Sequence, residues 1–240
     1  MNTISIKNKG SVRIIAHRGC SGLEKENTMP AFVAAGNRSY FGIETDIHKT
    51  KDGKYIVIHD DTTARVAIDN MVVEETDYDT LRALPLTDKD GVAGRIDLRM
   101  PNLTEYINVC RYYEKYAVLE IKNAFLEEDI LEIVDIIEKL GYLDKTIFIS
   151  FCFENLKSLR KSHPTIAAQF LTKAFSEDLI PRLKEYNLDL DIRHSALDKE
   201  KIALCHENGI LVNCWTVDDA DKAEQLILNG VDFITTNILE

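Results

Sequence analysis

The feature that most constrains the fold of this chain is a regular alternation of short apolar runs with longer amphipathic stretches. The apolar runs are rich in Ile, Val and Leu, as the buried strands of a parallel sheet are. Eight such runs cover residues 13–17, 41–48, 116–122, 146–151, 166–171, 188–192, 210–217 and 231–236. Their alternation with helices along 240 residues predicts an α/β fold, the parallel TIM (β/α)8 barrel, which is commonly about 250 residues long.

Helical patterns fill the intervals between these runs. In 126–141 the apolar residues recur at helical spacing and end at Gly141, a residue type that commonly follows a helix. Asn27 and Thr28 can cap a helix over 29–39. Further helices are predicted over 154–162, 176–186, 198–209 and 218–230.

One segment breaks the alternation. The run 54–60 follows Asp52-Gly53, a strong hairpin signal, and is predicted to fold back on the second strand. Residues 61–115 then lack strong strands, and we interpret them as an excursion over the barrel mouth that ends in a helix over 103–116. The chain is thus predicted to be a single domain, 1–240, with an insertion at about 61–115. An open doubly wound sheet is the rival architecture, and the hairpin and the insertion favour the barrel.

The charge balance restricts the partners. The formal net charge is −11 and the isoelectric point is about 5.1. A general nucleic-acid binder needs a basic face, so this class is not expected. A small phosphorylated substrate is compatible with the net charge, because a few local cations and a metal ion can attract it.

Cysteine usage and the lack of long apolar segments both favour the cytoplasm as the compartment. The five cysteines are scattered, without a CxxC spacing, which fits neither a disulfide framework nor a zinc site. No segment approaches the roughly 20 apolar residues of a membrane-spanning helix, and the N-terminus lacks a signal-like apolar run. We therefore expect a cytoplasmic protein without an integral membrane segment, either a monomer or a homo-oligomer.

Acidic residues recur at the ends of two predicted strands. Glu44 and Asp46 are two residues apart, and so are Glu120 and Lys122, so that each pair shares one strand face. In a barrel, the C-terminal ends of the strands meet at one rim. Carboxylates gathered there can bind one hard divalent cation, Mg²⁺ or Ca²⁺, with Mn²⁺ as a further candidate. A solvated strand-end residue is the alternative for any single acid, and the two pairs together favour the metal site.

Two histidines and two cations end the same strands. His17 and His59 can each act as a general acid or base, or can simply be hydrogen-bonded strand-end residues. Arg18 and Lys122 can bind phosphate oxygens, or pair with the neighbouring acids. Trp215, at the end of the seventh strand, is either a wall for a small substrate or part of the core.

The remaining histidines are weaker candidates. His48 shares the strand face of the acids and can lie beside the site. His194 falls in a loop that can be near the site. His163 and His206 lie in helical or turn context and are expected to be structural or exposed.

Several sequence blocks, in order, are similar to those of one enzyme family. The blocks are AHRG (16–19), ENTMPAF (26–32), GIETD (42–46), TKDG (50–53), VIHD (57–60), LEIK (119–122), ISF (149–151), NCWTV (213–217) and NGVDFITTN (229–237). The chain resembles the glycerophosphodiester phosphodiesterases over nearly its full length. As a set the blocks are highly specific, although no single block suffices.

The resemblance implies a TIM barrel, a divalent metal, and hydrolysis of a glycerophosphodiester to an alcohol and sn-glycerol 3-phosphate. It also implies a role for each matched residue. The implied roles are metal ligand for Glu44, Asp46 and Glu120, acid/base pair for His17 and His59, phosphate contact for Arg18 and Lys122, and support for Glu26. Residues 61–115 match the family's insertion.

The chain departs from the family at two places. Thr236-Asn237 stands where the family usually has Thr-Asp followed soon by Pro, and the run 191–198 matches no family pattern. Both departures lie in the later half of the barrel. They bear on substrate choice more than on the chemistry.

The expected mechanism is acid/base catalysis on a metal-bound phosphodiester. One histidine takes a proton from the nucleophile, either the glycerol 2-hydroxyl, through a cyclic phosphate, or a water. The other protonates the leaving alcohol. Two alternatives use the same barrel: a lipid phosphodiesterase of the sphingomyelinase D type, and a non-catalytic barrel that binds a metabolite. The lysine and tryptophan blocks favour a soluble glycerophosphodiester over the lipid substrate of the sphingomyelinase D type. The complete set of acids, histidines and cations argues against the non-catalytic barrel.

Overall fold

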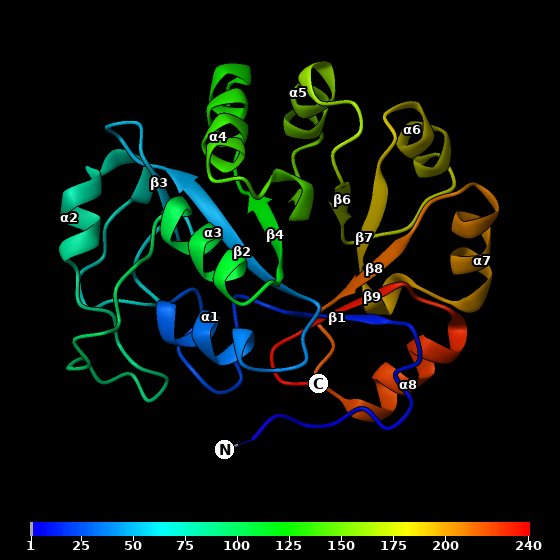
Figure 1. Ribbon diagram of the computed structural model, residues 1–240, viewed down its shortest axis with the longest axis horizontal. Coiled ribbons are helices and arrows are strands. Elements are labelled where there is room, and N and C mark those ends of the chain that lie inside the picture. The colour runs from blue at the N-terminus through cyan, green and yellow to red at the C-terminus, as the bar shows by residue number, and fades with distance from the viewer. Residues whose placement is uncertain (1) are drawn as a thin grey trace.

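The computed structural model describes residues 2–240 and shows a closed parallel barrel surrounded by helices (Figure 1). Strand β1 pairs in parallel with both β2 and β9, so that the sheet closes on itself. Around the barrel the order is β1-β9-β8-β7-β6-β5-β4-β2, with β3 antiparallel on β2. The TIM barrel prediction is confirmed, and the open doubly wound sheet is excluded because an open sheet has two unpaired edges.

The strands match the predicted apolar runs. They are β1 (Arg13–Ala16), β2 (Gly42–Lys49), β3 (Tyr55–Val57), β4 (Tyr116–Ile121), β5 (Thr146–Ser150), β6 (Ala168–Thr172), β7 (Asp189–Arg193), β8 (Val212–Trp215) and β9 (Phe233–Thr236). Some runs extend beyond the paired residues, because apolar side chains continue to pack where the ladder has ended. Val217, for example, lies beyond β8 and is 1% exposed.

Seven helices of the described chain cover the outside of the barrel: α1 (Met29–Gly36), α3 (Leu103–Tyr112), α4 (Glu127–Lys139), α5 (Phe153–Ser162), α6 (Leu179–Glu185), α7 (Lys199–Glu207) and α8 (Ala220–Asn229). The short helix α2 (Tyr78–Ala83) belongs to the segment between β3 and α3 (Figure 1). Short 3-10 helices lie between these elements at Val73–Glu75, Leu143–Lys145 and His194–Ala196. The cap of α1 is Thr28 alone, which accepts a hydrogen bond from the Ala31 N–H. Asn27 does not cap the helix, contrary to the expectation for the Asn27-Thr28 pair.

The lumen of the barrel contains an apolar cluster and a polar one. The apolar cluster is made of Ile15, Val118, Ile147, Ile149, Leu171 and Phe233. In the polar cluster, Asn213 Nδ2 donates to Gln169 Oε1 at 3.0 Å and Thr235 Oγ1 donates to Asn213 Oδ1 at 3.2 Å. Two residues after Ile15 comes His17, and two residues after Val118 comes Glu120, on the same strand faces. The predicted site residues His17 and Glu120 therefore lie one step further along their strands, at the C-terminal rim.

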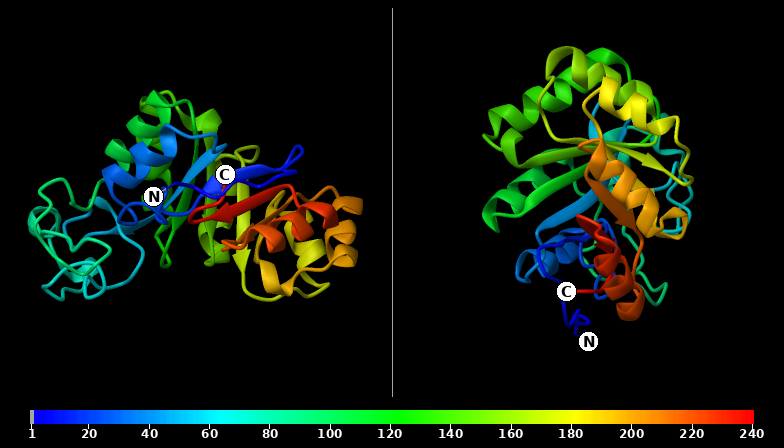
Figure 2. Two further views of the ribbon diagram at one scale, coloured as in Figure 1. Left: turned by 90° about the horizontal axis from the view of Figure 1, so that it is seen from below. Right: turned by 90° about the vertical axis from the view of Figure 1, so that its right-hand side faces the viewer.

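The segment between β3 and α3 has an apolar cluster of its own. Its buried members, together with two residues of the hairpin, are Ile56, Ile58, Val66, Ala67, Val73, Leu81, Leu84, Leu86, Leu98 and Met100. The segment lies beside the barrel, next to α1 (Figures 1 and 2). It contacts the loop after β1, where Arg95 Nη1 donates to Glu24 Oε2 at 2.8 Å.

The segment expected to pass over the barrel mouth lies at its edge. Arg65 Nη1 donates to Glu26 Oε2 at 2.6 Å and Lys89 Nζ to the Ser21 carbonyl at 3.0 Å, while within the described residues no side chain from 61–115 lines the pocket at the rim. The reason is that the apolar residues of this segment pack on one another and on β3. That packing holds the segment against the side of the hairpin.

Two further expectations concern cysteines and membrane spans. All five cysteines are free, and four of them are buried, with Cys152 partly exposed. In the part of the chain that the structure describes, no helix combines the length and the apolarity that a membrane crossing needs.

The turn after β1 depends on a glycine. Gly19 has φ +75, and a Cβ added there would lie 2.7 Å from the carbonyl carbon of Ala31 in α1. This close approach lets the Arg18 N–H donate to Glu44 Oε2 at 2.7 Å, and the Gly19 N–H to the Glu44 carbonyl at 3.2 Å. The turn thus presses residues 17 and 18 against β2.

Gly19→Ala is predicted to destabilise the fold more than Gly91→Ala. Gly91 has a similar φ of +82 but nothing within 4 Å of the added Cβ, so only left-handed strain of about 1 kcal/mol is expected there. At Gly19 the clash with α1 should add about 1–3 kcal/mol. Denaturant unfolding followed by circular dichroism measures both variants, and equal losses would contradict the close-packed turn.

Candidate metal and catalytic site

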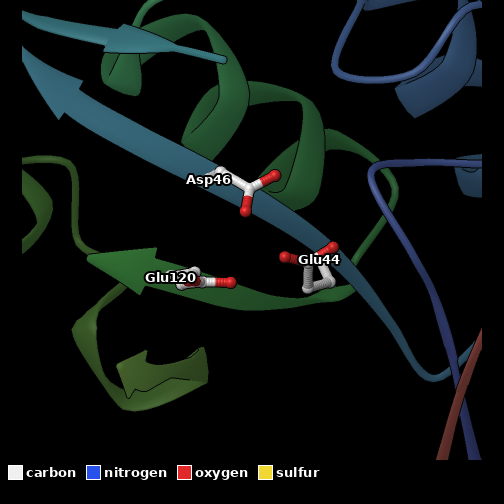
Figure 3. A group of neighbouring side chains, drawn as sticks. All are labelled: Glu44, Asp46 and Glu120. Carbon is white, nitrogen blue, oxygen red and sulfur yellow. The ribbon is translucent and has the colours of Figure 1, made fainter. Parts of the chain in front are cut away.

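Three carboxylates converge at the upper rim of the barrel. Glu44 and Asp46 come from β2 and Glu120 from β4, and the strand register places Asp46 directly opposite Glu120. Each residue offers an oxygen that lies within 4.8 Å of the other two (Figure 3). All three are buried, at 2%, 1% and 7% exposure. The structure therefore brings together the predicted E-x-D pair and the predicted third acid.

Two cations partly compensate these acids. Lys122 Nζ lies 2.9 Å from Glu120 Oε1 and 3.5 Å from Asp46 Oδ1. Arg18 Nε lies 3.6 Å from Asp46 Oδ2. Three carboxylates thus face two fixed cations in a buried site, which leaves one negative charge without a partner.

The uncompensated charge appears in the pKa values of the acids. Burial, together with repulsion from Asp46 and Glu120, raises the pKa of Glu44 well above its usual value. Burial and Asp46 raise the pKa of Glu120 to about 8. Burial alone would raise the pKa of Asp46 as well, but Arg18 and Lys122 hold it well below its usual range. A bound cation would therefore let all three acids ionise, which their mutual repulsion opposes in its absence.

The donor set fits a hard divalent cation. In the described chain, Asp46 Oδ1 and Glu120 Oε1 are buried and accept no well-aligned hydrogen bond, and Lys122 Nζ, at 3.5 and 2.9 Å, is a cation that they share. Asp46 Oδ2 accepts a hydrogen bond from Asn27 Nδ2 at 2.8 Å, which fixes the carboxylate plane. An all-oxygen set of this kind is suited to Mg²⁺, Ca²⁺ or Mn²⁺.

His17 is oriented by a neutral amide. Its Nδ1 lies 2.8 Å from Asn237 Oδ1, and Asn237 Nδ2 donates to Asp218 Oδ2 at 2.6 Å. The second bond fixes the amide so that its oxygen faces the ring. An amide oxygen only accepts, so Nδ1 carries the proton and Nε2 presents a lone pair. Burial, followed by the nearby Arg18, lowers the pKa of His17 to about 4.

His59 is oriented by a carboxylate instead. Its Nδ1 lies 2.5 Å from Asp60 Oδ1, and Asp60 Oδ2 accepts from Arg65 Nε at 2.6 Å. Burial lowers the pKa of His59, with Asp46 opposing that shift most and Asp60 also raising it. The two imidazoles therefore have different electrostatic environments: His17 is held by an uncharged group and His59 by an anion.

Glu26 joins the catalytic rim to the segment beside the barrel. Its carboxylate accepts from Arg18 Nη1 at 2.8 Å and from Arg65 Nη1 at 2.6 Å. Burial opposes ionisation, but hydrogen bonds from Arg65 and the charge of Arg18 lower the pKa of Glu26 to about 2. The predicted supporting role agrees with this position, because Glu26 holds Arg18 beside Asp46.

The other histidines lie outside the pocket. His48 is fully buried, with Nδ1 3.1 Å from Glu74 Oε1 and Nε2 3.3 Å from the His59 carbonyl. It therefore lies behind His59 and supports it. His206 binds Asp232 on the outer surface.

The pocket at this rim contains most of the predicted site residues. Those that line it are His17, Arg18, Glu44, His59, Glu120 and Trp215. Trp215 also packs on the apolar cluster of the lumen, and its contact with a substrate stays a prediction.

Four residues near the site were not predicted. Asn237 and Asp60 orient the histidines, Asp218 fixes Asn237, and Asp191 lines the pocket. The departure from the family pattern at position 237 could have identified Asn237 as a site residue. The charged residues Asp189, Asp191 and Arg193, which alternate along β7, could have identified Asp191.

Comparison with known sequences identifies relatives over nearly the whole chain. A model of the glycerophosphoryl diester phosphodiesterase family matches residues 17–240. The chain is 30% identical over 230 residues to the protein YhdW of Bacillus subtilis (strain 168), covering 93% of each. It is 29% identical over 231 residues to a glycerophosphodiester phosphodiesterase of Caldanaerobacter subterraneus subsp. tengcongensis, again covering 93% of each.

A solved structure shares the same architecture. It is a phosphodiesterase from Oleispira antarctica in complex with its product sn-glycerol-3-phosphate. The two structures superpose with a TM-score of 0.86 and 27% sequence identity. The match covers 94% of this chain and 92% of the other.

Divalent metal binding is predicted to release a proton and to tighten as the pH rises. Because the empty site holds the pKa of Glu120 at about 8, a cation that binds below this pH must displace that proton. The metal dissociation constant should fall about tenfold per pH unit from pH 6 to 8 and then level off. Calorimetry in buffers of different ionisation enthalpy measures both effects.

Glu120→Gln is the control, because this variant has no proton to release at that position. Its metal affinity should be weaker and should change less with pH. An affinity of the unaltered protein that does not depend on pH would contradict the raised pKa of the cluster.

Proposed function

The chain belongs to the glycerophosphoryl diester phosphodiesterase family, and we propose that Glu44, Asp46 and Glu120 hold the divalent cation with which it hydrolyses a glycerophosphodiester to an alcohol and sn-glycerol 3-phosphate. The observation that carries this assignment is the buried carboxylate cluster in one pocket with two imidazoles and a guanidinium. When bound, the cation supplies Lewis-acid stabilisation of charge on the phosphoryl oxygens. Mg²⁺, Ca²⁺ and Mn²⁺ are the candidate ions.

Arg18 and Lys122 are proposed to contact the phosphate. Both already lie within 4.0 Å of the carboxylate cluster, so the anionic group would be drawn to the same place. Arg18 presents a planar fork and Lys122 a point charge. Once the phosphodiester is present, both cations can stabilise negative charge that develops on its oxygens.

The two histidines are proposed to have opposite roles. His17 presents an unprotonated Nε2 to the pocket and has only a neutral amide behind it, which suits a general base. His59 has the Asp60 carboxylate behind it, which offsets part of the lowering of its pKa by burial and makes it the better candidate for the general acid. His17 would take the proton of the nucleophile, either the glycerol 2-hydroxyl, through a cyclic phosphate, or a water. His59 would protonate the leaving alcohol.

Product analysis over a panel of glycerophosphodiesters, each with Mg²⁺, Ca²⁺ or Mn²⁺, tests the proposed function. We expect sn-glycerol 3-phosphate from the soluble diesters and little release from lysophospholipids or sphingomyelin. Preferred turnover of the lipids would support the related lipid phosphodiesterase instead. Binding of a diester without turnover in any of the three metals would support a non-catalytic barrel.

His17→Ala and His59→Ala are each predicted to lower kcat about 10²–10⁴-fold, the usual contribution of general acid or base catalysis. His206→Ala, on the outer surface, serves as the control and should keep full activity. Metal affinity of the two variants should stay close to that of the unaltered protein, since neither ring is a proposed ligand. Near-full turnover in either variant would overturn the acid/base assignment.

The assigned roles also predict how the pH profile moves. Asp60→Asn removes a charge that raises the pKa of His59, so the alkaline limb of kcat/KM should move to lower pH. Asn237→Asp places a carboxylate beside His17 Nδ1 and should raise its pKa, so the acidic limb should move to higher pH. If each variant moved the opposite limb, the base and the acid would have to be exchanged.

A further inference from the structure

The pocket has a second wall that the proposed chemistry does not use. It is built from β6, β7 and β8 and contains Leu171, Asp191 and Trp215. In the closed order of eight parallel strands, β7 is four strands away from β2 in either direction. This wall therefore lies across the barrel from Glu44 and Asp46.

Asp191 is a buried carboxyl group without a partner. Its side chain is 2% exposed, and within residues 2–240 its Oδ1 has no hydrogen-bond partner. Burial, together with repulsion from Glu120, raises the pKa of Asp191 well above its usual value, so that the group can donate as well as accept a hydrogen bond. An unpaired buried polar group costs stability and is most readily explained by a ligand that pairs with it.

Asp191 is not a further ligand of the proposed cation. Among the described residues, the oxygens that lie within 4.8 Å of one another belong to Glu44, Asp46 and Glu120 only. The Asp191 carboxyl is thus separate from the cluster but opens into the same pocket.

A second unpaired group lies on the neighbouring strand. Trp215 Nε1, like Asp191 Oδ1, has no hydrogen-bond partner in the described part of the chain. The register places Asp191 opposite Asn213, two residues before Trp215 on the same strand face. An indole N–H can only donate, so it requires an oxygen acceptor. The wall thus offers one group that accepts or donates and one that only donates.

Two exposed cations lie near the aromatic rings of this wall. The Arg193 guanidinium lies 5.8 Å from the Trp215 ring centroid, and Lys173 Nζ lies 5.8 Å from that of Phe151. The two rings pack edge to face with centroids 5.6 Å apart. Neither cation forms an ion pair within the residues described. Both side chains would therefore repel a positively charged ligand group, since no paired carboxylate of the described residues offsets their charge.

We propose that the wall formed by Asp191 and Trp215 binds hydroxyl groups of the leaving alcohol. The protein then prefers glycerophosphodiesters of polyols, such as a second glycerol or an inositol, to those of cationic amino alcohols such as choline. The inference rests on the proposed function, because it places the phosphodiester at the carboxylate cluster. From there, the leaving alcohol extends across the pocket toward β7. Its hydroxyl oxygens meet the Asp191 carboxyl and the Trp215 N–H, while Arg193 and Lys173 disfavour an ammonium group.

The test compares kcat/KM for glycerophosphoglycerol, glycerophosphoinositol, glycerophosphoethanolamine and glycerophosphocholine. For the unaltered protein, kcat/KM should be about tenfold or more higher for the two polyol diesters than for the other two. This is the effect expected of about one well-placed hydrogen bond together with the charges of Arg193 and Lys173. Hydrolysis of none of the four diesters would count against the proposed function itself. Hydrolysis with equal or better turnover of the choline diester would overturn only the present inference.

Asp191→Leu removes the hydroxyl contact and should lower kcat/KM about tenfold for the polyol diesters, with little effect on the choline diester. Asp191→Asn keeps the size and the hydrogen-bonding capacity, so it should retain most of the preference. Asp189→Asn is the matched control on the same strand face. Its carboxylate already accepts from the Leu211 N–H at 2.8 Å, so the substrate preference should not change.

Thermal stability separates a ligand contact from a structural role. Because an unpaired buried carboxyl is unfavourable, Asp191→Leu should raise Tm by about 2–4 °C while the polyol preference falls. A lower Tm with an unchanged preference would identify Asp191 as a structural residue and overturn the proposal. A loss of the choline diester alone in Asp191→Asn would show that the carboxylate binds an ammonium group, which would also overturn it.

The rim cations are tested by the double variant Lys173→Gln, Arg193→Gln. Its activity on the choline diester should rise several-fold at low salt and approach that of the unaltered protein at high salt. Lys145→Gln, at the opposite end of the barrel before β5, is the control and should leave the preference unchanged. No change in the double variant would contradict the role assigned to the rim charges.

Discussion

The site depends on the mutual repulsion of three buried carboxylates held side by side. Two unit charges about 4 Å apart still repel by about 4 kcal/mol at the effective dielectric of a protein site. The parallel ladder between β2 and β4 keeps Asp46 opposite Glu120, so the acids cannot move apart. Two fixed cations lower the repulsion without removing it. The site is therefore arranged to accept a divalent ion, and the turn at Gly19 places His17 and Arg18 against it.

The two halves of the pocket differ in how their polar groups are satisfied. On the β1, β2 and β4 side, most charged groups already contact partners, and these contacts fix the histidines and Arg18. On the β7 and β8 side, Asp191 and Trp215 keep polar atoms unpaired in the part of the chain that the structure describes. In the proposed function, the first arrangement would preorganise the reacting groups, and the second would leave groups free for the part of the substrate that differs between diesters.

The barrel and the carboxylate cluster could be predicted because both follow from local spacing. Alternating strands and helices favour the barrel, and an E-x-D or E-x-K pair shares a face on any strand. His17 and Asn237 are 220 residues apart in sequence, so their contact depends on barrel closure, which no local pattern describes. The packing of the segment 61–115 could not be predicted, because its apolar residues have no regular period and its own core became visible only in three dimensions.

Glu44, Asp46 and Glu120 are proposed to bind one divalent cation together. An anomalous difference map from crystals soaked in Mn²⁺ measures this binding. We expect a single strong peak at coordination distance from all three carboxylates. A map without a peak at this position, or with the ion bound elsewhere in the pocket, would contradict the proposal.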